Sequence, residues 1–249
     1  MSKPVLLIRA SNNEADADAL AKFGIRSVVD PYLQLSISPD AEPALALLSE
    51  IATCPPPIWI IATSVNAIEY WAKLVGENTL RKTFTSRPDL HFAAIGVKTA
   101  ETLGQYGAKE VMVPPKANSL ALAEVLVSDP RPAHAFIPGG NLAMPNLPNS
   151  LLAAGWQVSA ATVYVTETVR HEPMSVQLLR DQGIGAVLLR SPSAVRALTH
   201  FVPSPRIPLV CAGTTTAKAV QAKGLFVATI SAEPTPTAVA VAVRALLER

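Results

Sequence analysis

Short apolar runs separated by polar turns recur along the whole chain. The runs Val5–Ile8, Ile58–Ala62 and Ala133–Ile137 are apolar without alternation, which is typical of strands buried on both faces of a parallel sheet. Residues 67–74 place apolar side chains at helical spacing, as amphipathic helices do. Strands that alternate with helices in this way predict an α/β fold built on parallel sheets.

Local signals predict several element boundaries. Ser11-Asn12-Asn13-Glu14 has the form of a capping box that opens a helix, and Asn118 or Ser119 is expected to cap a helix through Val127. Glu110–Val113 is expected to form a strand before Pro114-Pro115. Residues 76–89 are polar and are interpreted as connecting chain.

One unit of the pattern occurs twice. Gly96, Thr99-Ala100 and Gly107 match Gly213, Thr216-Ala217 and Gly224 at a constant offset. Each copy is predicted to be a buried strand, a polar turn and a helix that ends at a glycine able to adopt positive φ. Ile58–Ile68 and Gly185–Val195 match in the same order. The repeat predicts two related domains, with function to be sought where they share a site.

Two segments in which apolar and polar residues alternate mark the domain boundaries, so the chain is not simply divided at its middle. Tyr32–Ile37 and Val158–Val169 lack the fully apolar character of the other strands, so residues 32–37 and 158–169 are expected to be paired linker strands. Residues 38–157 would then form one domain, and residues 1–31 with 170–249 the other.

Composition excludes several classes of protein. Apolar residues make up 49% of the 249 residues and charged residues 16%, so extensive disorder is not expected. The net charge is only +2 and the sequence contains no run of basic residues, so we expect no nucleic-acid partner. Cys54, Cys211 and the four histidines are scattered singly, which predicts no metal site and a reducing compartment. The start resembles no signal peptide, and no run is long enough to cross a membrane. These observations predict a cytoplasmic protein.

Polar turns follow the expected strands at their carboxyl ends, where open α/β sheets bind ligands. The same turns begin helices, whose free N–H groups suit anions. The hydroxyl and amide side chains in these turns are Thr63, Ser64, Asn66, Thr99, Ser191, Ser193, Thr214, Thr215 and Thr216. Each alone is better explained as an ordinary helix cap, but their repetition in both halves favours a common face that binds anions. No phosphate-binding glycine loop is present, so a nucleotide cofactor is not supported.

Several motifs in order resemble one family. They are Thr63-Ser64-x-Asn66-Ala67, Gly96-x-x-Thr99-Ala100, Gly139-Gly140, Val163-Tyr164-x-Thr166 and Gly213-x-x-Thr216-Ala217. Together they make nearly the whole chain similar to uroporphyrinogen-III synthase. The resemblance implies two similar parallel-sheet (flavodoxin-like) α/β domains joined by a two-stranded linker, with the first domain built from both chain ends.

The resemblance also implies a cofactor-independent lyase of tetrapyrrole biosynthesis. Such an enzyme takes hydroxymethylbilane, removes water, inverts ring D and closes the macrocycle as uroporphyrinogen III. Its partner would be this small-molecule substrate, with a transient handover from hydroxymethylbilane synthase. We expect a monomer with no nucleic-acid or membrane partner.

Site residues follow from the same resemblance. Tyr164 matches the tyrosine of the family's Val-Tyr motif and is the candidate general acid or hydrogen-bond donor, although packing at the hinge explains it equally well. Arg9 and Lys98 are candidate carboxylate contacts, with solvated surface positions as the alternative. Asn141 stands where an arginine is common and Arg190 where a threonine is usual, so Arg190 is expected to supply a charged contact. The glycines of the motifs, namely Gly96, Gly139, Gly140 and Gly213, complete the expected substrate-binding set.

Two other functions fit the pattern less well. A non-catalytic two-lobed protein that binds or senses a small molecule would use the same scaffold and a hinge. A nucleotide-dependent transferase would need the phosphate loop that the sequence lacks.

Overall fold

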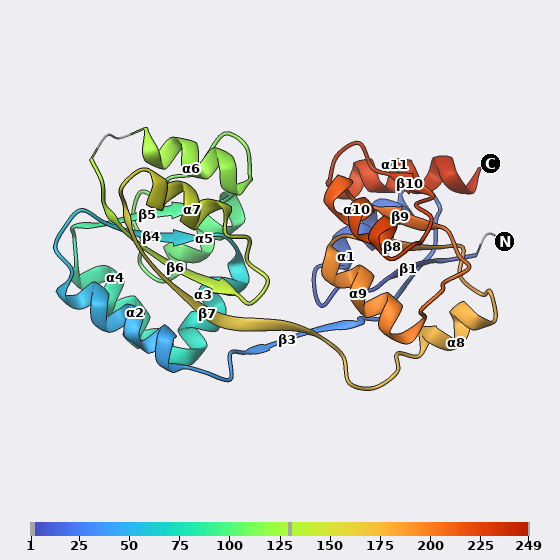
Figure 1. The fold of residues 1–249 in the computed structure, drawn as a ribbon, viewed down its shortest axis with the longest axis horizontal. Coiled ribbons are helices and arrows are strands. Elements are labelled where there is room, and N and C mark those ends of the chain that lie inside the picture. Colours follow the sequence, from blue (N-terminus) through green and yellow to red (C-terminus); the bar gives the residue numbers. More distant parts are fainter. Residues whose placement is uncertain (1–2, 129–130, 249) are drawn as a thin grey trace. The chain divides into compact units, whose positions relative to one another are not determined.

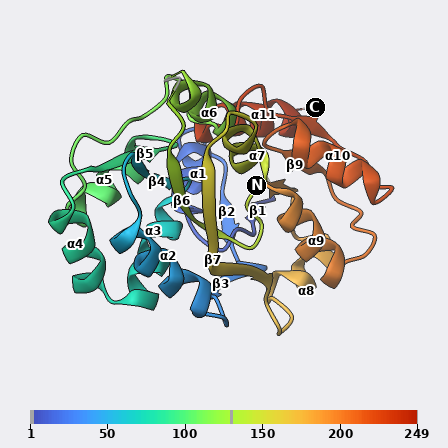
Figure 2. The same cartoon turned by 60° about the vertical axis from the view of Figure 1, so that its left-hand side comes forward.

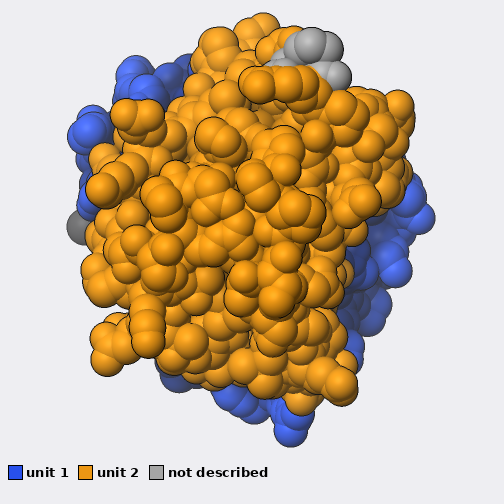
Figure 3. Space-filling view, turned by 90° about the vertical axis from the view of Figure 1, so that its left-hand side faces the viewer, with its two compact units in different colours: residues 1–35, 166–249 blue, residues 36–165 orange. Residues whose placement is uncertain are grey.

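The computed structural model describes residues 3–128 and 131–248, which form two compact units (Figures 1 and 3). Unit 1 comprises Met1–Leu35 and Thr166–Arg249, and unit 2 comprises Ser36–Val165. The chain passes from one unit to the other twice, once within β3 (Leu33–Ile37) and once within β7 (Gln157–Thr168).

The expected linker segments coincide with these two strands, but β7 is also a full member of a sheet. Its residues Gln157–Thr162 and Tyr164 pair with a neighbouring strand. The division into two independent domains stays a prediction, because it concerns whether each part folds alone. Residues 1–2, 129–130 and 249 of the expected domains lie outside the described residues.

Unit 1 is built on a five-stranded sheet of order β10-β9-β8-β1-β2, in which every pairing is parallel. Its strands are β1 (Val5–Leu7), β2 (Ser27–Val29), β8 (Ala186–Leu189), β9 (Leu209–Cys211) and β10 (Thr229–Ile230). The three central strands are buried along their whole length, as the unbroken apolar runs predict. This is the flavodoxin-like order, whose topological switch point lies between β1 and β8.

Helices cover both faces of the unit 1 sheet (Figures 1 and 2). One apolar core joins the sheet to α8 (Ser175–Arg180), α9 (Pro192–Phe201) and α10 (Thr214–Ala222). A second core, on the other face, joins it to α1 (Glu14–Ala21) and α11 (Pro236–Leu247).

Unit 2 has a sheet of order β3-β7-β6-β4-β5. The pairings among β4 (Ile58–Ala62), β5 (Leu90–Ala94), β6 (His134–Gly140) and β7 are parallel, and β3 lies at the edge beside β7. The chain visits β4, β5, β6 and β7 in that order, so the strand order reverses between β4 and β6. The switch point of unit 2 therefore lies at the carboxyl ends of β4 and β6.

Two helical layers enclose the unit 2 sheet (Figure 1). The first layer consists of α2 (Glu42–Thr53), α3 (Val65–Val75), α4 (Glu77–Ser86) and α5 (Val97–Gln105). In its core Trp71 is fully buried and donates its ring N–H to the Ala44 carbonyl at 3.0 Å. The opposite layer consists of α6 (Ser119–Val127) and α7 (Asn146–Ala153).

The α/β fold with parallel sheets is confirmed, while three local predictions are wrong. Residues 77–86 form α4, where the sequence predicted only connecting chain. Glu110–Val113 is not a strand, because only Met112 bridges to Ala93 of β5. The expected capping box is absent, because the Asn13 side chain bonds the N–H and carbonyl of Arg9 instead of the first turn of α1.

Within residues 3–128 and 131–248, no helix is long and apolar enough to cross a bilayer.

Candidate functional site

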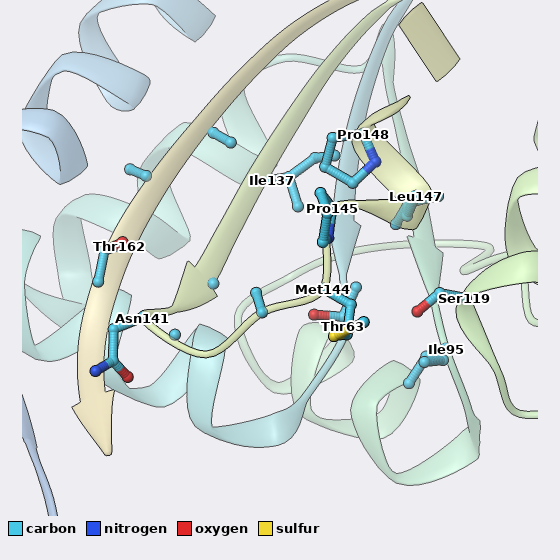
Figure 4. A pocket seen from close by; sticks show the side chains of 15 residues that line it. Thr63, Ile95, Ser119, Ile137, Asn141, Met144, Pro145, Leu147, Pro148 and Thr162 are labelled. Atoms are coloured by element: carbon cyan, nitrogen blue, oxygen red, sulfur yellow. The ribbon is translucent and has the colours of Figure 1, made fainter. Parts of the chain in front are cut away.

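A cavity lies at the switch point of unit 2, at the carboxyl ends of β4 and β6 and beside residues 160–162 within β7. Its volume is about 440 Å³, within the roughly 300–1,000 Å³ range of small-molecule sites. Figure 4 shows its lining side chains. They are Thr63, Ile95, Ser119, Ile137, Gly139, Gly140, Asn141, Ala143, Met144, Pro145, Leu147, Pro148, Ala160, Ala161 and Thr162.

Four residues expected from the sequence meet in this cavity. Thr63 follows β4, Gly139 and Gly140 end β6, and Asn141 follows β6. They meet because the parallel strands β4 and β6 are neighbours and present their carboxyl ends at one edge of the sheet. Ser64, the next residue after Thr63, does not line the cavity. Its hydroxyl accepts from the Ala67 N–H at 3.1 Å and caps α3.

Sequence reasoning missed the apolar wall of the cavity. The connection from β6 to α7, residues 141–145, supplies Met144 and Pro145, and the first turn of α7 supplies Leu147 and Pro148. Met144 is 64% exposed, an unusual position for a large apolar side chain in a short loop. Exposed apolar residues in a loop at a strand's carboxyl end are the signal that could have revealed this wall.

Polar groups occupy a few points among these apolar walls. Thr63, Ser119, Asn141 and Thr162 bring hydroxyl and amide groups to the cavity (Figure 4). Apolar walls with a few polar groups are typical of small-molecule sites, in which the polar groups fix the orientation of the ligand. No carboxylate or basic side chain lines the cavity, so its chemistry is that of binding and orientation.

The two repeat units each begin a helix at a glycine. Gly96 precedes α5 and Gly213 precedes α10, and neither helix has a side-chain cap. The first N–H groups of these helices are therefore not satisfied by a capping side chain. Such helix starts favour carboxylates.

The threonines of the repeat do not all reach the surface. Thr99 and Thr216 are 5% and 3% exposed and lie in the interior, against the expectation that their hydroxyls face a ligand. Each sits in the first turn of its helix and points toward the core. Lys98, Thr214 and Thr215 are exposed beside the same helix starts.

The switch point of unit 1 holds two arginines and one aspartate. Arg190, after β8, bonds the Asp16 carboxylate through Nε and Nη2, and its Nη1 donates to the Pro234 carbonyl. Arg190 is thus engaged within the protein, and the expectation that it contacts a substrate carboxylate is not supported by this geometry. Asp16 is 2% exposed, so the ion pair is buried and joins α1 to the end of β8.

Arg9 lies beside this pair, after β1. Burial lowers the pKa of the Arg9 guanidinium, and the positive charge of Arg190 lowers that pKa further. The guanidinium donates a long hydrogen bond of 3.4 Å to the Asn12 carbonyl. A partly buried guanidinium repelled by a second one is stabilised by an added anion.

Three other residues expected at the site, Ser191, Ser193 and Asn66, lie at the starts of α9 and α3. Ser191 caps α9 by accepting from the Ala194 N–H at 3.3 Å, and its hydroxyl is 2.8 Å from that of Ser193. Asn66 is half-buried in the first turn of α3.

Tyr164 does not line the unit 2 cavity. It packs against the core on the α2–α5 side of the sheet, with its ring 5.5 Å from the ring of Tyr70. The Asn141 N–H donates to its backbone carbonyl at 3.1 Å. Its side chain is half-buried, so the phenol is held at the edge of the sheet next to Gly140.

The described part of the chain contains no group of three or more His, Cys, Asp or Glu side chains able to hold a metal. Both cysteines are free thiols.

Comparison with known proteins identifies the family. The model of the family described as "Uroporphyrinogen-III synthase HemD" matches residues 14–240. No curated protein matches the chain in sequence. Among solved structures, a mutant uroporphyrinogen III synthase from the extremely thermophilic bacterium Thermus thermophilus has a TM-score of 0.63 at 15% identity, covering 99% of each chain. Uroporphyrinogen-III synthetase from Helicobacter pylori has a TM-score of 0.62 at 16% identity, covering 99% of this chain and all of the other. These structures are similar in fold, and the family match over most of the sequence shows that the chain belongs to the uroporphyrinogen-III synthase family.

Proposed function

We propose that this protein converts hydroxymethylbilane into uroporphyrinogen III, with loss of water and inversion of ring D. This is the reaction of the family to which the chain belongs. The observation that carries the proposal is the unit 2 cavity, which lies where the fold favours ligands and has apolar walls with polar groups among them.

The cavity suits part of a linear tetrapyrrole. A pyrrole ring has two apolar faces, which Ile137, Leu147 and Pro148 would contact. The acetate and propionate groups on the ring need hydrogen-bond donors, which Thr63 and Asn141 would supply. We propose that one end of the substrate binds here, because the full molecule has four such rings.

The other carboxylates need further donors. We propose Lys98 and the uncapped start of α5 as carboxylate-binding positions of unit 2, and Arg9 and the uncapped start of α10 as those of unit 1. Each pairs an anion with a positive charge or with the positive end of a helix. Arg190 has no direct contact in this proposal, because it holds Asp16.

The chemistry consists mainly of holding a reactive intermediate. When the hydroxymethyl C–O bond breaks, the oxygen leaves as water after gaining a proton, and the electron-rich pyrrole stabilises the resulting cation. We propose that the Tyr164 phenol donates a hydrogen bond to the departing hydroxyl. Orientation of the rings for attack at the substituted position of ring D then decides which isomer forms, and orientation is worth several kcal/mol.

The proposed reaction also bears on the partner enzyme and on the compartment in which the protein works. Free hydroxymethylbilane closes without inversion, so we propose direct handover from hydroxymethylbilane synthase. We also propose a cytoplasmic monomer, which the free thiols support.

The test is the isomer made by the purified full chain. Freshly prepared hydroxymethylbilane is added without metal or nucleotide, and the products are oxidised and separated as type I and type III porphyrins. Type III product supports the proposal, and type I product alone contradicts it. A non-catalytic binding protein, the main alternative, would give type I product while still binding the substrate.

Two variants connect the cavity to this activity. Asn141→Ala removes a polar group from the cavity, and Leu152→Ala removes a comparably exposed apolar side chain from α7 outside it. We expect a higher KM for the first variant and an unchanged KM for the second. The same KM for the two variants would show that the substrate binds outside this cavity.

A further inference from the structure

Strand β7 contains an extra residue where it runs beside the end of β6. Gly139 pairs with Thr162 and Gly140 with Tyr164, so Val163 has no partner on β6. An extra residue of this kind is a β-bulge, which bends the strand and redirects the side chains that follow.

The bulge determines which face of the sheet Tyr164 occupies. Neighbouring residues of a regular strand point to opposite faces, yet Val163 and Tyr164 both pack against the core on the α2–α5 side. The unit 2 cavity includes Ile137 and Leu147, which belong to the core on the α6–α7 side. The bulge therefore turns Tyr164 away from the α6–α7 face and toward α3.

The Tyr164 ring occupies the space that a side chain at position 140 would need. A Cβ atom on Gly140 would lie 2.5 Å from Cζ, 2.8 Å from Cε2 and 2.8 Å from the hydroxyl oxygen of Tyr164. Carbon atoms in contact are normally separated by about 3.5–4.0 Å, so any other residue at position 140 would displace the ring. At Gly139 an added Cβ atom would meet only the Ala143 Cβ, at 3.6 Å.

Two further contacts hold the ring and its backbone. The Tyr70 ring of α3 lies 5.5 Å from the Tyr164 ring at an interplanar angle of 34°, and the Lys73 ammonium lies 4.5 Å from the centre of the Tyr70 ring. The Asn141 N–H donates to the Tyr164 carbonyl at 3.1 Å. The phenol is thus enclosed by Gly140 and by a second aromatic ring.

We propose that Gly140 and Tyr70 are positioning residues, which hold the Tyr164 phenol at the carboxyl edge of β6 in the orientation that the reaction uses. The inference rests on the proposed function, in which this phenol assists the loss of water. A hydrogen-bond donor contributes to the rate only when its O–H lies within reach of the reacting atom. Gly140 thereby acts through Tyr164, and its role differs from that of Gly139, which only lines the cavity.

The test compares Gly140→Ala with the control Gly104→Ala, in which the added Cβ atom on α5 meets no other atom within 4 Å and lies outside the cavity. We expect Gly140→Ala to lower kcat by about tenfold or more with little change in KM, because it displaces a catalytic donor rather than a binding contact. Gly104→Ala should leave kcat within about twofold of the unaltered protein. Equal kcat values for the two variants would overturn the assignment of Gly140.

Repeating the Gly140→Ala change in a Tyr164→Ala protein tests whether Gly140 positions Tyr164 or contacts the substrate itself. In Tyr164→Ala the space beside Gly140 is empty, so adding Gly140→Ala should change kcat by less than about twofold. A tenfold loss in that background would show that Gly140 acts on the substrate directly. The thermal midpoints should show the same coupling, and this readout needs no activity. If the unaltered protein makes only type I product, the proposed function fails while the thermal coupling still tests the packing of residues 140 and 164.

Tyr70 provides an independent variant if Gly140→Ala folds poorly. Tyr70→Phe keeps the ring and should keep kcat, whereas Tyr70→Ala should lower kcat about as much as Gly140→Ala. Equal kcat values for Tyr70→Phe and Tyr70→Ala would contradict a positioning role for the ring.

Discussion

Asp16→Asn tests the conclusion that Arg190 belongs to the scaffold of unit 1. The change keeps the size of the side chain and removes the charge that faces the Arg190 guanidinium. The two side chains are 2% and 11% exposed, so the remaining guanidinium would be buried without a counter-charge. Breaking a buried ion pair in this way lowers the free energy of unfolding by about 3–5 kcal/mol.

An exposed ion pair in the same unit supplies the control. Arg180 and Glu172 form a two-point ion pair, with both side chains about half exposed. Glu172→Gln should lower the free energy of unfolding by less than about 1 kcal/mol. With a urea dependence of about 1–3 kcal/mol per molar, the Asp16→Asn midpoint should fall by at least about 1 M.

The assay can follow the two units separately. The three tryptophans, Trp59, Trp71 and Trp156, all lie in unit 2, so their fluorescence reports on unit 2 and circular dichroism reports on both units. We expect Asp16→Asn to shift the dichroism transition more than the fluorescence transition. The reasoning is refuted if Asp16→Asn shifts the midpoint no more than Glu172→Gln does. Replacing both Asp16 and Arg190 by apolar residues should recover much of the loss and preserve type III product.

Three further predictions concern other parts of the molecule. Gly213→Asp should stabilise α10 by a few tenths of a kcal/mol or more, because a side chain at this open position can cap the helix. The same variant should raise KM, because its carboxylate competes with the substrate. Gly213→Ser, a neutral cap, should stabilise α10 without the same rise in KM. Burial raises the pKa of Tyr32 to about 12, so the unfolded state ionises first and stability should fall between about pH 10 and 12; a Tyr32→Phe protein that keeps the same alkaline loss would contradict this. Cys54 should react with a thiol reagent before Cys211, because Cys211 is fully buried and burial raises its pKa to about 11; faster labelling of Cys211 would count against the described core.

The sequence predicts the elements whose signals are local. The apolar run Ile58–Ala62 forms β4 with the predicted bounds, and Ser64 caps α3 as expected. Local pattern fails at residues 77–86, whose helix has only Leu80 and Phe84 buried and is otherwise polar. It also fails at Glu110–Val113, where an apolar run makes one bridge because sheet pairing depends on a distant strand.

The candidate site is predictable only in part, for a related reason. Thr63 and Asn141 are found because each follows a predicted strand, and parallel strands bring their carboxyl ends together. The position of Arg190 depends on Asp16, which is distant in sequence and carries no motif. The orientation of Tyr164 depends on a bulge that forms only when β6 and β7 are paired, and alternation along the sequence places its side chain on the wrong face.

The isomer ratio of the product is the measurement closest to the central claim. It is followed while the concentration of the purified chain is raised against a fixed amount of fresh hydroxymethylbilane. We expect the type III share to rise with protein concentration until it accounts for nearly all product, since enzymic closure then outruns spontaneous closure. A product that stays type I at every protein concentration would contradict the account.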